Sequence, residues 1–338
     1  MRWLHQPHAR TWRCAPADPA ATTFHQHLPN YHPTPLINAG NAGNGTRLVC
    51  KDESERLGLP AFKILGASWA VHKLLNQRAD TQVLVAATDG NHGRAVARAA
   101  AEHKRGCKVF VPNGVHPTAI EAIASEGAQV VRVAGSYDEA VHKAAEAAGA
   151  AGHALVQDTA LPGYTDVPQW IVDGYATLFR ELDAQLAVAP DLVVVPAGVG
   201  SLAQAAVTHY RSTGSATAVL TVEPVAAACV LASLRAGALT TVSTSDTIMA
   251  GLNCGTPSPA AWEHLRHGLD AAIAITDADS RAAAVELADA GIAAGPCGAA
   301  ALAGARAALA TELAGLLGIG ATATVALIST EGPDANPH

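Results

Sequence analysis

Short apolar runs alternate with helix-like segments along most of this 338-residue chain. Six runs have the length of buried strands: residues 83–87, 108–112, 129–133, 192–196, 218–222 and 324–328. Helical patterns follow the second and third runs, at residues 118–126 and 138–148, and an alanine-rich helix is expected after the first. Strands that alternate with helices in this way are typical of parallel sheets with crossover helices, so the sequence predicts an α/β fold.

The same alternation suggests how the chain is divided. The first three runs and their helices form a compact unit, which predicts a small domain at residues 64–152. A large domain would combine residues 20–63 with residues 153–338, in line with about two domains for a chain of this length. Residues 1–19 form an N-terminal tail that we expect to be poorly ordered.

One lysine has unusual neighbours. Lys63 lies between Phe62 and Ile64, where a helix that contains glycine and alanine is expected to begin. Burial among apolar side chains disfavours the ammonium form, which lowers the pKa of a lysine and makes its amine nucleophilic. Such an amine suits a Schiff base with an aldehyde cofactor or a carbonyl substrate. The alternative is a lysine with a buried stem whose ammonium group reaches water.

Two glycine-bearing turns each follow a strand-like run and precede a helix. The first holds Asp89, Gly90 and Asn91, and the second spans residues 198–201. Glycine permits unusual backbone angles, and the free amides at a helix start can bind an anion. Each loop alone is weak evidence, because many α/β proteins contain one. Their order after Lys63 is the informative feature.

With these three stretches, the sequence resembles the fold type II pyridoxal-phosphate enzymes, and among them most closely the diaminopropionate ammonia-lyases. Further segments match in the same order over nearly the whole chain: residues 24–36, 51–54, 87–93, 156–160, 163–164, 247–252 and 329–332. The resemblance implies a two-domain α/β fold of the tryptophan synthase beta type with parallel-rich sheets and helices on both faces. It also implies pyridoxal 5'-phosphate as cofactor and a homodimer.

The resemblance also implies roles for particular residues. Lys63 would bind the cofactor as a Schiff base, and Asn91 would hydrogen-bond its ring hydroxyl. The phosphate would be held by Gly198, Val199, Gly200 and Ser201. Ser329 would face the pyridine nitrogen, where a hydroxyl leaves the ring largely unprotonated and favours elimination. Tyr137 would lie near the ring.

Some of these residues also have simpler interpretations. Asn91 is a common turn residue, Ser329 could cap a strand end, and Tyr137 could be an ordinary residue at a helix start.

Two acidic residues suggest the substrate. Asp89 stands where related dehydratases have serine or threonine, and Asp158 resembles a second acid of the diaminopropionate lyases. Two carboxylates would attract a substrate with a second, cationic amine, and one could act as a base. Thr88 would join them in binding the substrate. Asp158 could instead be a cap or turn residue.

The resemblance has one local departure, and other functions remain open. At residues 294–299, Pro296 and Cys297 replace an acid and a hydroxyl expected near the cofactor, and the thiol could be inert packing or could tune the site. The predicted reaction is β-elimination from 2,3-diaminopropionate or a close β-substituted amino acid. A β-replacement synthase, a serine or threonine dehydratase, and a binding protein without catalysis are the alternatives.

Composition excludes some classes of protein. A net charge of −7 without a basic cluster argues against nucleic acid as a partner. No apolar run approaches the roughly 20 residues of a membrane span, and the N-terminus lacks an apolar signal core, so we expect a cytoplasmic protein. Six scattered cysteines form no metal-binding pattern. Cys229 and Cys254 both lie in segments expected to border the site, and they could pair under oxidation.

Overall fold

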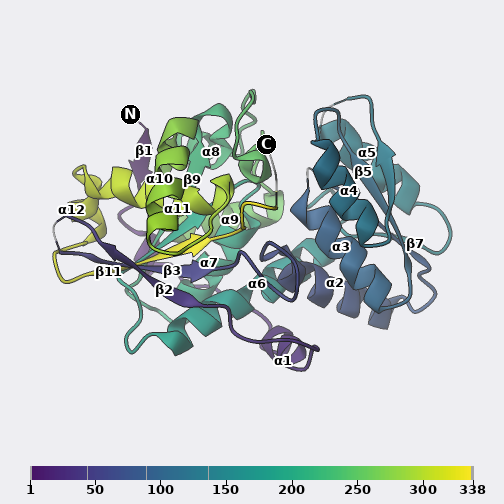
Figure 1. The fold of residues 1–338 in the computed structure, drawn as a ribbon, viewed down its shortest axis with the longest axis horizontal. Helices are drawn as coiled ribbons and strands as arrows, with labels where there is room; N and C mark the ends of the chain where they lie inside the picture. Colours follow the sequence, from purple (N-terminus) through teal and green to yellow (C-terminus); the bar gives the residue numbers. More distant parts are fainter. Residues whose placement is uncertain (1, 44, 89, 136, 336–338) are drawn as a thin grey trace.

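The computed structural model describes residues 2–43, 45–88, 90–135 and 137–335, and these residues form two sheets (Figure 1). The seven-stranded sheet has the order β1 (Trp3–His5), β10 (Ala271–Ile275), β9 (Ala218–Pro224), β8 (Leu192–Pro196), β11 (Thr324–Ser329), β3 (Arg47–Asp52) and β2 (Leu36–Asn41). The four-stranded sheet has the order β6 (Gln129–Arg132), β5 (Gly106–Val111), β4 (Val83–Ala87) and β7 (His153–Leu155). All neighbouring strands are parallel except the β1–β10 and β2–β3 pairs.

Helices cover both sheets, as predicted for an α/β fold. In the described residues the α-helices are α1 (Ala20–Gln26), α2 (Lys63–Gln77), α3 (Asn91–Glu102), α4 (Pro117–Ser125), α5 (Tyr137–Ala148), α6 (Asp166–Gln185), α7 (Ser201–Ser212), α8 (Cys229–Ala236), α9 (Pro259–Gly268), α10 (Asp277–Asp289), α11 (Pro296–Leu309) and α12 (Leu313–Leu317). Short 3-10 helices lie at η1 (Ala9–Thr11), η2 (Val225–Ala227) and η3 (Ala250–Leu252). None of these helices is both long and apolar enough to cross a membrane.

Strand β4 shows why the runs are apolar throughout. Leu84 and Ala86 belong to the core that includes residues of α3, whereas Val85 and Ala87 belong to a separate core with α5. Because helices cover both faces of the sheet, alternate side chains are buried on opposite sides and none can be polar.

The start of α2, which carries Lys63, is set by close packing against α6. A Cβ atom on Gly66 would lie 2.6 Å from Tyr175 Cε1, and one on Gly174 would collide with the Leu65 carbonyl. The backbones of the two helices therefore approach more closely than larger residues allow. This contact holds the first turn of α2 against α6.

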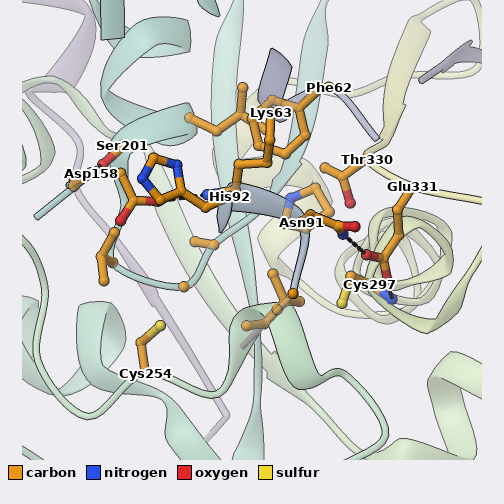
Figure 2. Close-up of a pocket in the computed structure, with 18 of the residues that line it drawn as sticks. Phe62, Lys63, Asn91, His92, Asp158, Ser201, Cys254, Cys297, Thr330 and Glu331 are labelled. Carbon is orange, nitrogen blue, oxygen red and sulfur yellow. Dashed lines mark hydrogen bonds and ion pairs between the residues drawn. The ribbon is translucent and has the colours of Figure 1, made fainter. Parts of the chain in front are cut away.

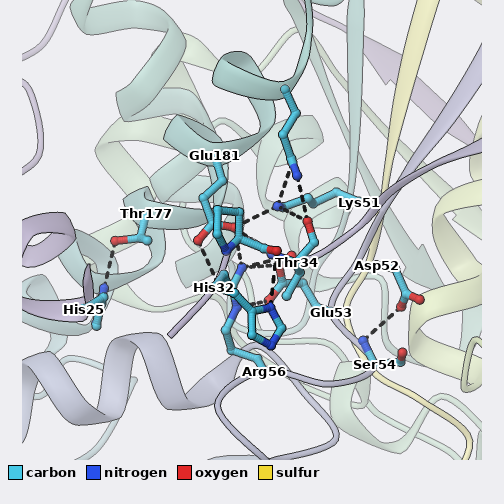
Figure 3. Close-up of polar contacts among 12 residues, drawn as sticks. His25, His32, Thr34, Lys51, Asp52, Glu53, Ser54, Arg56, Thr177 and Glu181 are labelled. Carbon is cyan, nitrogen blue, oxygen red and sulfur yellow. Dashed lines mark hydrogen bonds and ion pairs between the residues drawn. The ribbon is translucent and has the colours of Figure 1, made fainter. Parts of the chain in front are cut away.

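A buried ionic network lies upstream of Lys63 (Figure 3). Arg56 contacts Glu53 and Glu181 at 2.6 and 2.7 Å, and Lys51 contacts Glu181 at 2.7 Å. Thr34 donates to Glu53 at 2.6 Å. The two cations and two carboxylates are almost fully buried and balance in charge. The network ties β3 and the segment that follows it to α6.

Two expectations about the chain's division differ from the structure. Within the tail expected to be poorly ordered, Trp3–His5 pairs with β10, and Arg10 contacts Asp270 at 2.7 Å. β10 is apolar throughout and would otherwise be an open edge, which β1 covers. The expected limit at residue 152 also separates β7 (His153–Leu155) from the small sheet, although β7 pairs with β4 there. The remaining domain limits stay a prediction.

Candidate active site

A pocket lies where the carboxyl ends of several parallel strands face the start of α2. Such ends are the usual place for ligands in parallel α/β sheets. Most of the predicted site residues line it: Lys63, Thr88, Asn91, Tyr137, Asp158, Gly198, Val199, Gly200 and Ser201. Figure 2 shows the side chains of Lys63, Asn91, Asp158 and Ser201 converging from different segments of the chain. Asp89, predicted to join them, lies outside the described residues.

Lys63 and Asp158 form a partly buried ion pair. Lys63 Nζ lies 2.7 Å from Asp158 Oδ2. Burial opposes the charge on Lys63, but the Asp158 carboxylate outweighs burial and raises the pKa of the lysine above its ordinary value. Burial likewise opposes the charge on Asp158, yet Lys63 lowers its pKa to about 2. The sequence-based expectation of a lowered lysine pKa is therefore wrong, because it left out the carboxylate.

The glycine loop after β8 forms a narrow cradle at the start of α7. Gly200 has a φ of 92°, in the left-handed region that favours glycine. A Cβ atom on Gly198 would lie 3.0 Å from both Cys254 Sγ and the Gly251 carbonyl oxygen, so a larger residue would displace its neighbours. Ser201 Oγ donates to the Asp158 carbonyl at 2.9 Å, which links the cradle to the ion pair.

Cys229 and Cys254 border the same loop. Neither forms a disulfide with another described residue. Cys229 donates to the Gly198 carbonyl at 3.6 Å, and Cys254 lies against Gly198 on the pocket side. Their pairing under oxidation stays a hypothesis.

On the opposite wall, Asn91 begins α3 and Thr88 directly follows β4. Asn91 Nδ2 donates to Glu331 Oε2 at 2.6 Å, and Thr88 Oγ1 accepts the Gly90 N–H at 2.9 Å. Tyr137 accepts a hydrogen bond from Gln157 Nε2 at 2.9 Å and lines the pocket. These bonds leave the three side chains at fixed places around the cavity.

Ser329 lies behind the pocket wall and not on it. Its neighbour Thr330 lines the cavity, whereas the Ser329 hydroxyl is buried without a hydrogen-bond partner among the described residues. A Cβ atom on Gly298 would lie 2.7 Å from this hydroxyl, so the start of α11 leaves room for it. The role predicted for Ser329 stays a prediction.

Sequence reasoning assigned no role to two pocket residues, His92 and Glu331. His92 Nε2 lies 2.9 Å from the Val156 carbonyl, so this nitrogen carries the proton, and Nδ1 has no partner among the described residues. Burial lowers the pKa of His92, which keeps the ring neutral. Both residues stand in segments that match the family, beside Asn91 and Ser329. Their position in these segments was the sequence signal that could have identified them as pocket residues.

The model of the pyridoxal-phosphate dependent enzyme family matches residues 27–330, and the chain belongs to this family. Its fold is that of the fold type II members.

Within the family, the chain is 36% identical to the diaminopropionate ammonia-lyase of Escherichia coli K12 over 273 residues, which are 73% of this chain and 69% of that protein. It is 36% identical to the Salmonella typhimurium enzyme over 287 residues, 75% and 71% of the two chains. The crystal structure of the E. coli enzyme in complex with D-serine matches with a TM-score of 0.87 at 31% identity, covering 98% of this chain and 94% of that one.

The residues present fit pyridoxal phosphate. The Gly198 cradle at the start of a twelve-residue helix suits a phosphate group, because a side chain there would fill the space and the helix N-terminus favours an anion. Lys63 presents the only amine that the described residues bring to the pocket wall. Among the described residues no group of three histidine, cysteine or acidic side chains could hold a metal ion.

Proposed function

We propose that this protein is a pyridoxal-phosphate-dependent carbon–nitrogen lyase that removes ammonia by β-elimination from 2,3-diaminopropionate or a close β-substituted amino acid. The final products would be pyruvate and ammonia. The observation that carries the proposal is the buried Asp158 carboxylate 2.7 Å from the Lys63 amine. The similarity to the diaminopropionate ammonia-lyases of two bacteria supports the same substrate.

Asp158 explains the preference for a diamine. With a pKa of about 2, it is ionised at neutral pH, and a buried carboxylate requires a cation. Lys63 supplies this cation while its amine is free. When that amine is bound to the cofactor, the second ammonium group of diaminopropionate can take its place, whereas the hydroxyl of serine cannot.

The other residues bind, orient and move protons. When bound, pyridoxal phosphate supplies an electron sink for the substrate's α carbon. With the substrate's second ammonium group paired with Asp158, Lys63 Nζ would be neutral and would accept the α proton, and the second amine, already protonated, would leave as ammonia. Backbone amides of residues 198–201 would hold the phosphate, and Asn91 would bind the ring hydroxyl. Asp89 is the proposed second base.

A substrate panel tests the reaction class. The purified protein is mixed with L- or D-2,3-diaminopropionate, serine, threonine or O-acetylserine, and pyruvate or 2-oxobutyrate is followed by a coupled assay. Turnover of diaminopropionate well above that of serine supports the proposal. Faster turnover of serine or threonine would identify a dehydratase instead, and turnover that requires an added nucleophile would identify a synthase.

A pair of variants tests Asp158 itself. Asp158→Asn should lower kcat/KM for diaminopropionate by about 10- to 100-fold, because one charge-assisted contact is lost, and should affect serine less. Asp183→Asn is the matched control, since Asp183 contacts His209 and Tyr210 away from the pocket. Equal losses for both substrates would contradict the assignment.

The sequence also predicts a cytoplasmic homodimer. The family resemblance supports the dimer, and the absence of disulfides among the described residues is compatible with a reducing compartment. Gel filtration with light scattering measures the oligomeric state, and fractionation of cells measures the location.

A further inference from the structure

Glu331 is held at a junction of three segments. It follows β11, and its backbone bridges Ala61, two residues before Lys63. Its carbonyl accepts the N–H of Gly295 at 2.9 Å, just before α11. The residue is 2% exposed, and its side chain lines the pocket. The place of its carboxylate is therefore determined by the backbone on both sides.

The start of α11 favours an ionised carboxylate at this place. Glu331 Oε1 accepts the N–H of Cys297 at 3.3 Å, in the first turn of a fourteen-residue helix whose N-terminus stabilises negative charge. Burial, and then the charge of Glu331, raises the pKa of the Cys297 thiol, so this thiol stays protonated. Two hydrogen-bond donors, the Cys297 N–H and the Asn91 amide, thus face the Glu331 carboxylate.

An ionised carboxylate decides which way the Asn91 amide faces. Glu331 Oε2 lies 2.6 Å from Asn91 Nδ2 (Figure 2). A carboxylate can only accept hydrogen bonds, so the amide nitrogen of Asn91 must face it and the amide oxygen must point elsewhere. The bond uses one of the two N–H groups. It also crosses the pocket, because Asn91 begins α3 beside the small sheet and Glu331 follows a strand of the large sheet.

We propose that Glu331 is a positioning residue that fixes the orientation of the Asn91 amide, so that the second N–H serves the ring oxygen of the cofactor. This inference rests on the cofactor role proposed for Asn91. Without the carboxylate, the amide can rotate and turn its carbonyl oxygen toward the ring oxygen, where two acceptors repel. Glutamine at 331 removes the orientation because its amide accepts either face of Asn91.

The experiment uses the whole protein and needs no substrate. Cofactor-free wild type, Glu331→Gln, Asn91→Ala and the double variant are titrated with pyridoxal phosphate. The titration yields Kd and the ratio of the two absorption bands that report whether the ring oxygen carries a proton. Glu126→Gln is the matched control, since Glu126 contacts Arg94 and Arg98 of α3 at 3.1 and 2.6 Å but lies away from the pocket.

Glu331→Gln should weaken cofactor binding about ten-fold, the effect of one charge-assisted hydrogen bond, and should shift the band ratio. The double variant should bind no more weakly than Asn91→Ala alone, because Glu331 acts through Asn91. Glu126→Gln should keep the wild-type ratio. Should the glutamine variant not fold, Glu331→Asp provides the same comparison with a withdrawn carboxylate.

An unchanged band ratio, or losses in the double variant that simply add, would overturn the proposal. Absence of diaminopropionate turnover in the wild type would count against the proposed function only, since both readouts here come from the cofactor.

Discussion

Replacing Glu181 by glutamine tests how the chain holds the segment that leads to Lys63. Glu181 accepts hydrogen bonds from Lys51, from both terminal nitrogens of Arg56 and from the Tyr31 hydroxyl, each at 2.7 Å. Removal of its charge leaves Lys51 and Arg56 with Glu53 as their remaining carboxylate in the network, so a net positive charge stays buried (Figure 3).

The expected cost follows from that uncompensated charge. Loss of one partner from a buried ion pair lowers the free energy of unfolding by roughly 3–5 kcal/mol. With a urea dependence of about 3 kcal/mol/M, the unfolding midpoint should fall by at least about 1 M. The assay is urea unfolding of the cofactor-free protein, followed by tryptophan fluorescence.

A second substitution separates charge from shape. Lys51→Met in the Glu181→Gln background removes one of the two cations, restores neutrality and should recover part of the lost stability. A midpoint unchanged by Glu181→Gln would refute the reasoning. So would a double variant less stable than the single one, because the network would then be held by packing and not by charge balance.

Four further predictions concern the site and its supports. Lys63→Ala should abolish both turnover and the cofactor absorbance shift, and substantial activity of this variant would contradict the role of Lys63. Asp89→Asn should retain the cofactor and show lower turnover, and unchanged kinetics would rule out a chemical role for Asp89. Gly198→Ala should weaken pyridoxal phosphate binding by about ten-fold or more, measured by absorbance titration, because its Cβ would press on the Gly251 carbonyl; wild-type affinity would show that the loop can yield. Burial lowers the pKa of His25 from 6.5 to about 4, so the neutral ring contributes its full stabilisation above pH 6.5. About 3 kcal/mol of the free energy of unfolding should be lost as the pH falls toward 4. A His25→Gln variant with the same pH dependence in urea unfolding would contradict this prediction.

Local sequence pattern determined most of the secondary structure. The runs at 83–87 and 192–196 form β4 and β8 with the expected bounds, and the helix expected at 138–148 begins one residue earlier. Strands buried on both faces must be apolar throughout, so they can be recognised as continuous apolar runs in the sequence alone. The short β1 carries no such run, and its order comes from pairing with the edge of β10.

The sequence also predicted most of the residues that line the pocket around Lys63, through the resemblance of its segments to a known family. The tertiary structure alone decided their electrostatics. Asp158 is 95 residues from Lys63, so no local pattern reveals that its carboxylate raises the lysine's pKa. Glu331 is likewise 240 residues from Asn91, so no local pattern reveals their hydrogen bond. The type of each residue can be read from the sequence. The electrostatic environment of a buried group, however, depends on neighbours that only folding brings within a few ångströms.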